Sequence, residues 1–133
     1  AEGFGLSTLE SLSCGTPIIV NMTGGLQEQV TDGEDWFGVG IQPAAKAVIG
    51  SQDIPYIYED RVSQESVVSA LVEMYEKREN LRDIGLMGRN HVLKNYGFDK
   101  FCKSWDMFLK SMHDKHGSWE NRRNYKAWEL IEV

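Results

Sequence analysis

Cysteine, proline and long apolar runs are scarce in this sequence, and each scarcity excludes a class of protein. The two cysteines, Cys14 and Cys102, lie far apart and outside any CxxC pair, so we expect reduced, buried thiols and no disulfide framework. No apolar run reaches about 18 residues, the length that a membrane-spanning helix needs. Only three prolines occur in 133 residues, and 41% of the chain is hydrophobic, which is typical of a soluble globular protein and not of a disordered one.

Basic residues are outnumbered by acidic ones. The 14 lysines and arginines against 20 aspartates and glutamates give a formal charge of −6, which disfavours nucleic acid and anionic membranes as partners. The sequence does not open with the charged stretch and following apolar stretch of a secretory signal, so we expect a cytoplasmic location. The length suits one domain. Because the chain starts without Met and inside a motif, we expect a fragment of a longer protein.

The first third of the chain has the pattern of an α/β fold. Leucines at every third position predict a short helix over Leu6–Cys14, which Gly15 and Pro17 would end. The apolar run Ile18–Val20 and the later run Trp36–Ile41 predict buried strands, with a brief helix between them. Strand, helix and strand at this spacing indicate a parallel crossover unit.

The rest of the chain is predicted to be mainly helical. Residues 43–60 show no sustained period and are expected to form an insertion or loop, with one short strand at Tyr56–Tyr58. Apolar residues at helical spacing then predict amphipathic helices. They begin at Ser63 or Ser66, span 79–96 and 98–112, and restart at Ser118 after the polar stretch 113–117.

These patterns predict a partial domain over 1–112 and a helical extension over 113–133. The extension mixes basic and aromatic residues at a helical spacing that favours docking onto protein. His113, Asp114 and His116 are interpreted as a solvated linker and not as a metal site. Two or three strands do not make a stable open sheet, so further strands are expected upstream, and the incomplete sheet is expected to promote homo-oligomers.

The segment EGFGLSTLE, residues 2–10, has the chemistry of an anion site. Its two glycines permit a ligand to approach the backbone, and the helix that follows presents free N–H groups at its positive end. This arrangement suits a phosphate. Ser7 and Thr8 could add hydroxyl donors, and the Glu10 carboxylate could accept hydrogen bonds from a vicinal diol such as that of ribose.

Two simpler interpretations of these carboxylates stay open. Ser7 and Glu10 have the spacing of a capping box, in which Glu10 would reach back to a backbone N–H and hold no ligand. Glu2 precedes the helix and could be an ordinary solvated residue near a positive helix end. Glycine-rich turns before helices are common, so the glycines alone do not decide the question.

The longer string resembles a known family. "EGFGLSTLESLSCGTPIIV" followed by "TGGLQEQVTDGE" resembles the signature of the retaining, nucleotide-sugar-dependent glycosyltransferases called family 4 or group 1, which have the GT-B fold. The resemblance is dense over residues 1–41, whereas the helices from 63 to 112 agree only in order and length. It implies an α/β fold, the C-terminal part of a Rossmann-like nucleotide-binding domain, with a short parallel sheet followed by long helices.

The resemblance also implies roles for positions within the motif. These are Glu2 in the catalytic centre, facing the donor sugar; Gly3, Phe4 and Gly5 along that sugar; the amides of Leu6 and Ser7 at the diphosphate; and Glu10 at the ribose. The implied donor is a UDP, GDP or ADP sugar, with no metal or other cofactor. Many family members have Pro where this chain has Ser7, which keeps the capping-box interpretation open.

Parts of the family's active site are missing from this sequence. The basic Arg and Lys pair that clamps the diphosphate would lie upstream, as would the N-terminal acceptor-binding domain and its histidine. We therefore expect the isolated chain to bind nucleotide weakly and to transfer no sugar. The alternative function is a noncatalytic module that uses its exposed sheet edge and helices to bind a partner or itself. A phosphorylase or epimerase of the same fold is a third, less favoured hypothesis.

Overall fold

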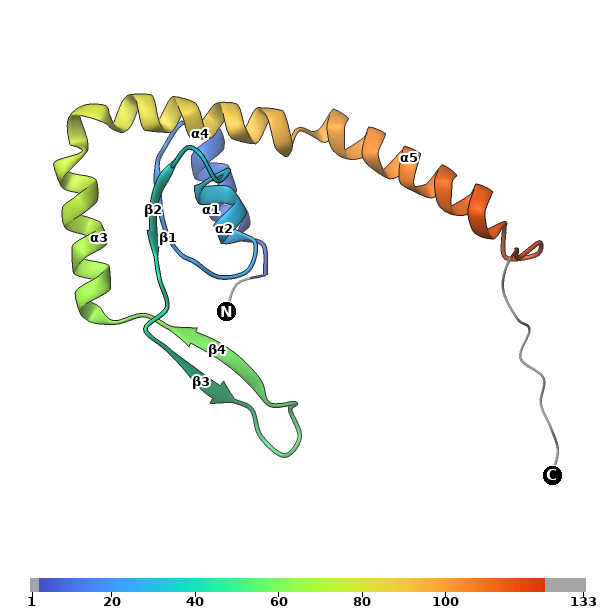
Figure 1. The fold of residues 1–133 in the computed structure, drawn as a ribbon, viewed down its shortest axis with the longest axis horizontal. Helices are drawn as coiled ribbons and strands as arrows, with labels where there is room; N and C mark the ends of the chain where they lie inside the picture. Colours follow the sequence, from blue (N-terminus) through green and yellow to red (C-terminus); the bar gives the residue numbers. More distant parts are fainter. Residues whose placement is uncertain (1–2, 124–133) are drawn as a thin grey trace. The chain divides into compact units, whose positions relative to one another are not determined.

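The computed structural model describes residues 3–123 of the chain (Figure 1). These residues divide into two compact units, with the boundary between Asn95 and Tyr96. The elements of the first unit are α1 (Leu6–Ser13), β1 (Ile18–Asn21), α2 (Leu26–Val30), β2 (Gly38–Ile41), β3 (Ala45–Ile49), β4 (Ile57–Arg61), α3 (Gln64–Glu76), a 3₁₀ turn η1 (Arg78–Asn80) and α4 (Leu81–Asn95). The second unit contains α5 (Phe98–His116).

The two apolar runs form a short parallel sheet. β1 pairs with β2 in a register that begins at Ile18 and Gly38 and ends at Asn21 and Ile41. Most of the side chains of both strands are buried, as expected for a sheet covered on both faces. The predicted crossover unit and the α/β fold class, a short parallel sheet accompanied by several helices, are confirmed.

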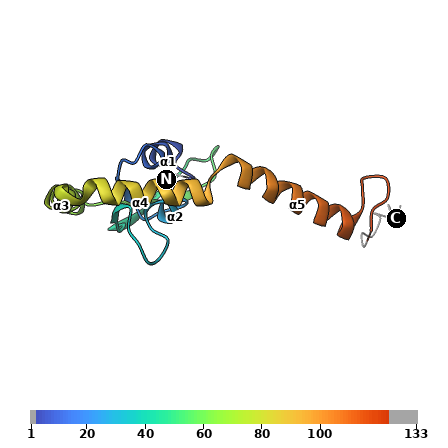
Figure 2. The same cartoon turned by 90° about the horizontal axis from the view of Figure 1, so that it is seen from above.

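Helices lie on both sides of these strands (Figure 1). Figure 2, seen from above, shows α3 at one end of α4 and α1 and α2 beside α4. On one side α3 packs against β2, where Val39, Ile41 and Ala70 form a buried cluster. On the other side α2 packs against β1, and α1 packs against α4. The start of α3 is as predicted, because the Ser63 Oγ accepts a hydrogen bond of 3.1 Å from the Ser66 N–H and caps the helix.

The Cys-Gly-Thr-Pro segment ends α1 with a Schellman motif. Gly15 takes a φ of 78°, which favours glycine, and its N–H donates to the Leu12 carbonyl at 2.8 Å. The Thr16 N–H donates to the Ser11 carbonyl at 3.0 Å. The turn thereby satisfies carbonyls at the helix end and leads the chain directly into β1.

The packing surface of α4 differs from the predicted one. Periodicity places Leu86 or Met87, Val92 and Leu93 on its apolar side. Val92 is buried as expected, but Leu86, Met87 and Leu93 are exposed, and Gly85 and Gly88 are buried in their place. A Cβ at Gly85 would overlap the Gly15 carbonyl oxygen. The glycines therefore let α4 approach the end of α1 more closely than any side chain would permit.

The prediction of a loop over residues 43–60 was largely wrong. β3 and β4 form an antiparallel hairpin, in which Val48 lies opposite Tyr58 and Ile49 opposite Ile57. The short strand expected at Tyr56–Tyr58 overlaps β4 at Ile57 and Tyr58, whereas Tyr56 precedes the strand. Most hairpin side chains are exposed, so the segment lacks the alternation of apolar and polar residues by which a half-buried strand is recognised.

The second unit corrects the predicted break at residues 113–117. α5 continues to His116 and ends at Gly117, and its last turn carries His113, Lys115 and His116, where positive charge favours the negative end of a helix. Residues 118–123 are not helical, so the predicted last helix does not begin at Ser118, and its remainder lies outside the described residues.

The predicted burial of several side chains was also wrong. The apolar face of α5 was expected to be buried, but it is about half exposed. It consists of Phe101, Trp105, Phe108 and Leu109. Cys14 and Cys102 are free thiols, as expected, but both are exposed. Within residues 3–123, no helix combines the length and apolar character needed to cross a bilayer.

A turn at Asp32 and Gly33 follows α2 and affects one carboxyl group. The Asp32 Oδ1 accepts hydrogen bonds from the N–H groups of Asp35 at 2.8 Å and Glu34 at 3.1 Å. These two bonds, the first the stronger, hold the pKa of Asp32 below its ordinary value. The turn joins α2 to the strand that follows it.

We predict that Gly85→Ala lowers the free energy of unfolding by about 1–3 kcal/mol, the usual cost of overpacking. The Gly15 backbone cannot turn aside as a flexible side chain can, and the clash exceeds the gain of about 1 kcal/mol that alanine brings to a helix interior. Urea denaturation measures this change against Asn90→Ala, at an exposed position of the same helix. A Gly85→Ala variant as stable as this control would contradict the close contact.

Asp32→Asn is expected to flatten the acid limb of the stability curve. A carboxyl whose folded-state pKa is depressed stabilises the fold above its unfolded-state pKa, about 4, and that contribution is lost as pH falls through the folded-state value. Asparagine can accept the same turn bonds without titrating. Urea midpoints between about pH 2 and pH 6 test this, with Asp53→Asn in the exposed hairpin tip as control. Identical acid limbs for Asp32→Asn and the original chain would refute it.

Candidate functional site

The candidate site is the start of α1 together with the loop of Gly3, Phe4 and Gly5. Gly5 is the N-cap residue, with a left-handed φ of 82°, and no side chain caps the helix. Ser7 therefore lies inside the first turn and not at the cap, so the capping-box interpretation is wrong. The positive φ of Gly5 favours glycine at this position, and a Cβ there would also displace the Leu26 side chain.

Most of the groups that the sequence analysis assigned to a ligand are exposed. Leu6 and Ser7 are exposed in the first turn, where backbone N–H groups have no intrahelical acceptor. The Glu10 side chain, one turn further along, is also exposed and forms no hydrogen bond or ion pair with any residue in the range 3–123. Gly3 and Phe4 are exposed, whereas Gly5 is buried. Glu2, the predicted catalytic-centre residue, lies outside the described residues.

A buried glutamine supports the loop from below. Gln29 on α2 has no exposed surface, and its Nε2 donates to the Phe4 carbonyl at 2.5 Å and to the Gly5 carbonyl at 3.2 Å. Its Oε1 is 2.6 Å from the Thr8 hydroxyl, which donates to it. Gln29 was not among the predicted site residues. In the sequence, the burial of Gln29 is indicated only by its helical spacing, which places it on the same face of a short helix as the apolar Leu26 and Val30.

A glycine on the neighbouring turn provides the second contact to the loop. The Gly25 N–H donates to the Gly3 carbonyl at 3.1 Å. A Cβ at Gly25 would stand 3.0 Å from that carbonyl oxygen and 3.2 Å from the Phe4 Cα, so any other residue would push the two segments apart. The Thr-Gly-Gly motif after β1 therefore serves to bring the loop against α2.

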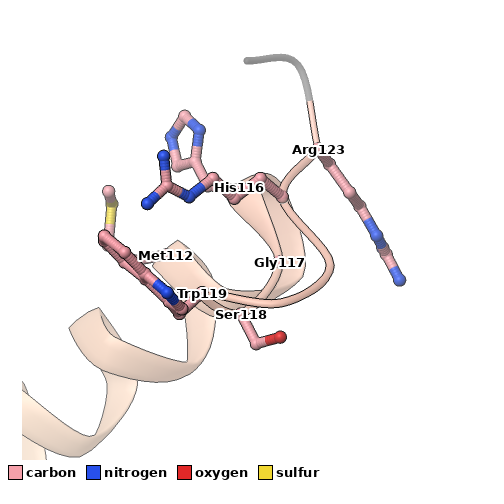
Figure 3. Close-up of a pocket in the computed structure, with 7 residues that line it drawn as sticks. Met112, His116, Gly117, Ser118, Trp119 and Arg123 are labelled. Atoms are coloured by element: carbon pink, nitrogen blue, oxygen red, sulfur yellow. The ribbon is translucent and has the colours of Figure 1, made fainter. Parts of the chain in front are cut away.

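Among the described residues, the predicted site residues come together at the start of α1. Two other kinds of site, a metal site and a pocket in the second unit, are the alternatives to it. Residues 3–123 contain no group of three or more His, Cys, Asp or Glu side chains that could hold a metal. A concavity of about 570 Å³ in the second unit is lined by Met112, His116, Trp119, Arg122 and Arg123 (Figure 3). There the Arg122 guanidinium stacks 3.9 Å from the Trp119 ring centre. Arg123 donates to the Asp114 carbonyl at 3.3 Å, so this pocket is part of the turn that closes α5.

We predict that Gln29→Leu lowers the free energy of unfolding by about 1–3 kcal/mol, because it removes both amide donors to the loop carbonyls in a buried site. The matched control is Gln27→Leu, the same change at an exposed position of the same helix, which should stay within about 0.5 kcal/mol. Chemical denaturation of both variants measures the difference. Equal losses would show that the buried carboxamide does not hold the loop.

Comparison with known proteins agrees with this geometry. The family model described as "Glycosyl transferases group 1" matches residues 1–91, which include the candidate site, both strand pairs and α3. No match was found among curated proteins. The matched segment covers well over half of the 133 residues. The chain belongs to the group 1 glycosyl transferase family.

Proposed function

We propose that this chain supplies the nucleotide-binding half of the donor site of a GT-B glycosyltransferase, which transfers a sugar from a nucleoside diphosphate to an acceptor with retention of configuration. The observation that carries the proposal is the left-handed N-cap at Gly5. Because no side chain occupies the cap, the first amides of α1 are available to a ligand, and the Glu10 carboxylate stands exposed beside them. Membership of the family supports the class of reaction.

The diphosphate would bind at the start of α1. The amides of Leu6 and Ser7 lie at the positive end of the helix, where an anion is stabilised. In the reaction, the bond between the anomeric carbon and the diphosphate oxygen breaks, and its electron pair goes to the leaving phosphate. Fixed amide dipoles stabilise that growing charge, and no metal is needed for this step.

The ribose and the sugar would bind on either side of the diphosphate. Glu10, one turn along α1, would accept two hydrogen bonds from the ribose hydroxyls. Glu2 would face the donor sugar, with the Gly3–Gly5 loop along it. The acceptor hydroxyl would attack the face from which the diphosphate leaves, so no covalent nucleophile is required of this chain.

Further parts of the active site would come from outside this sequence. A basic pair that neutralises the diphosphate and a domain that binds the acceptor would complete the enzyme. The isolated chain is accordingly proposed to bind nucleotide weakly and not to catalyse transfer. The proposed donor is a UDP, GDP or ADP sugar, and each nucleoside diphosphate can be tested separately.

Glu10→Gln is expected to weaken binding of the preferred nucleoside diphosphate by about tenfold, because charged hydrogen bonds to the ribose become neutral ones. Ligand-observed NMR of the chain with UDP, GDP and ADP measures the dissociation constants. Glu34→Gln, an exposed carboxylate in the turn after α2, is the control and should bind as the original chain does. Unchanged affinity in Glu10→Gln would remove Glu10 from the ribose site.

A further inference from the structure

The β3–β4 hairpin leaves the sheet at the edge where the candidate site lies. β1 and β2 are parallel, so their carboxyl ends meet at one edge, and in open α/β sheets ligands bind beyond that edge. The turn of Thr23, Gly24 and Gly25 follows β1 there, and the hairpin follows β2. Figure 1 shows the hairpin extending from this end of the strands. The hairpin therefore stands beside the turn that supports the Gly3–Gly5 loop.

One side-chain contact joins the hairpin to that turn. The Thr23 hydroxyl donates a hydrogen bond of 2.7 Å to the Oδ2 of Asp60 on β4, across 37 positions of sequence, in a half-buried place. A hydrogen bond to a carboxylate is roughly twice as strong as one between neutral groups. The adjacent Glu59 has a different partner, since it pairs with Arg61 at 2.8 Å. Asp60 is thus the hairpin carboxylate that reaches the turn.

The contact continues into the candidate site through the backbone. The Thr23 carbonyl accepts from the Leu26 N–H at 3.2 Å, which closes the turn. Within that turn the Gly25 N–H donates to the Gly3 carbonyl at 3.1 Å. Two hydrogen bonds, joined by the backbone from Thr23 to Gly25, therefore connect the hairpin to the loop. The first runs from the Thr23 hydroxyl to the Asp60 carboxylate, and the second from the Gly25 N–H to the Gly3 carbonyl. Moving Thr23 would move the donor that holds Gly3.

We propose that Asp60 is a positioning residue for the donor diphosphate. Through Thr23 and Gly25, Asp60 fixes the position of the Gly3–Gly5 loop. The loop in turn positions the first N–H groups of α1 so that they can donate hydrogen bonds to the diphosphate. This inference rests on the proposed function, because the loop is assigned there to the donor. It assigns the hairpin a role in donor binding without direct contact to the donor.

Two variants of Asp60 separate positioning from general stability. Asp60→Ala removes the acceptor for Thr23, whereas Asp60→Asn keeps an oxygen that can accept the same hydrogen bond. Glu59→Ala is the matched control, because it breaks the neighbouring ion pair on the same strand without touching Thr23. Backbone amide NMR of the chain without ligand reports the positions of Gly3, Gly5 and Gly25. Ligand-observed NMR then measures binding of UDP, GDP and ADP and of the corresponding nucleosides.

The proposal expects Asp60→Ala to shift the three glycine amide signals and to weaken the preferred nucleoside diphosphate by about tenfold. Nucleoside binding should stay unchanged, because the ribose is held by Glu10 and not by the loop. A variant that is merely less stable would not discriminate between the two ligands. Glu59→Ala is expected to match the original chain in all three readouts. Asp60→Asn should lie between the original chain and Asp60→Ala, because its neutral oxygen still accepts the Thr23 hydrogen bond but more weakly.

Three results would overturn the inference. Unmoved glycine signals in Asp60→Ala would break the connection from hairpin to loop. Shifted signals with unchanged diphosphate affinity would show that the loop does not set binding. If the original chain binds none of the three nucleoside diphosphates, the proposed function fails and the binding half of the inference fails with it, while the amide signals still decide the connection itself.

Discussion

The buried carboxamide of Gln29 is the interaction on which the candidate site depends. The loop before α1 turns two carbonyl oxygens inward, and buried carbonyls need donors if the fold is to be stable. Gln29 donates to both carbonyls from α2, the Gly5 carbonyl also accepts from the Leu9 N–H, and the Gln29 oxygen engages the Thr8 hydroxyl on α1. One side chain thereby ties the loop, α1 and α2 together, and the loop cannot change its path without exposing or abandoning these bonds.

The inward bonding of the loop explains why the outer surface of the site is open. Gly5 and Gly25 have no side chains, so the loop lies directly on α2, and the helix start is left uncapped. The first amides of α1 and the Glu10 carboxylate then face solvent as a preorganised pair of an electropositive helix end and an anionic acceptor. In the proposed arrangement α2 and the hairpin support the loop, and α1 provides the groups that would bind the donor.

The local pattern of residues along the sequence predicted the main elements of the fold. It did not predict the contacts between distant segments of the chain. The strands at Ile18 and Gly38 and the cap at Ser63 follow from periodicity and capping chemistry, and the predicted family was confirmed over residues 1–91. The capping box failed because the N-cap is Gly5, two residues upstream of Ser7, and the helix already begins at Leu6. Gln29 and the bond from Thr23 to Asp60 are contacts between distant segments, which spacing along the chain does not reveal. The break at residues 113–117 was wrong because polar and basic residues suit the exposed last turn of a helix as well as they suit a solvated linker.

The most direct test of the account is amide NMR of the chain titrated with the preferred nucleoside diphosphate and, separately, with its nucleoside. If the start of α1 holds the diphosphate, the amide signals of Leu6 and Ser7 will move strongly with the diphosphate and little with the nucleoside. The Glu10 region will respond to both. Largest shifts in the second unit, near Trp119 and Arg122, or equal responses of Leu6 and Ser7 to the two ligands, would contradict the assignment of the diphosphate to this helix.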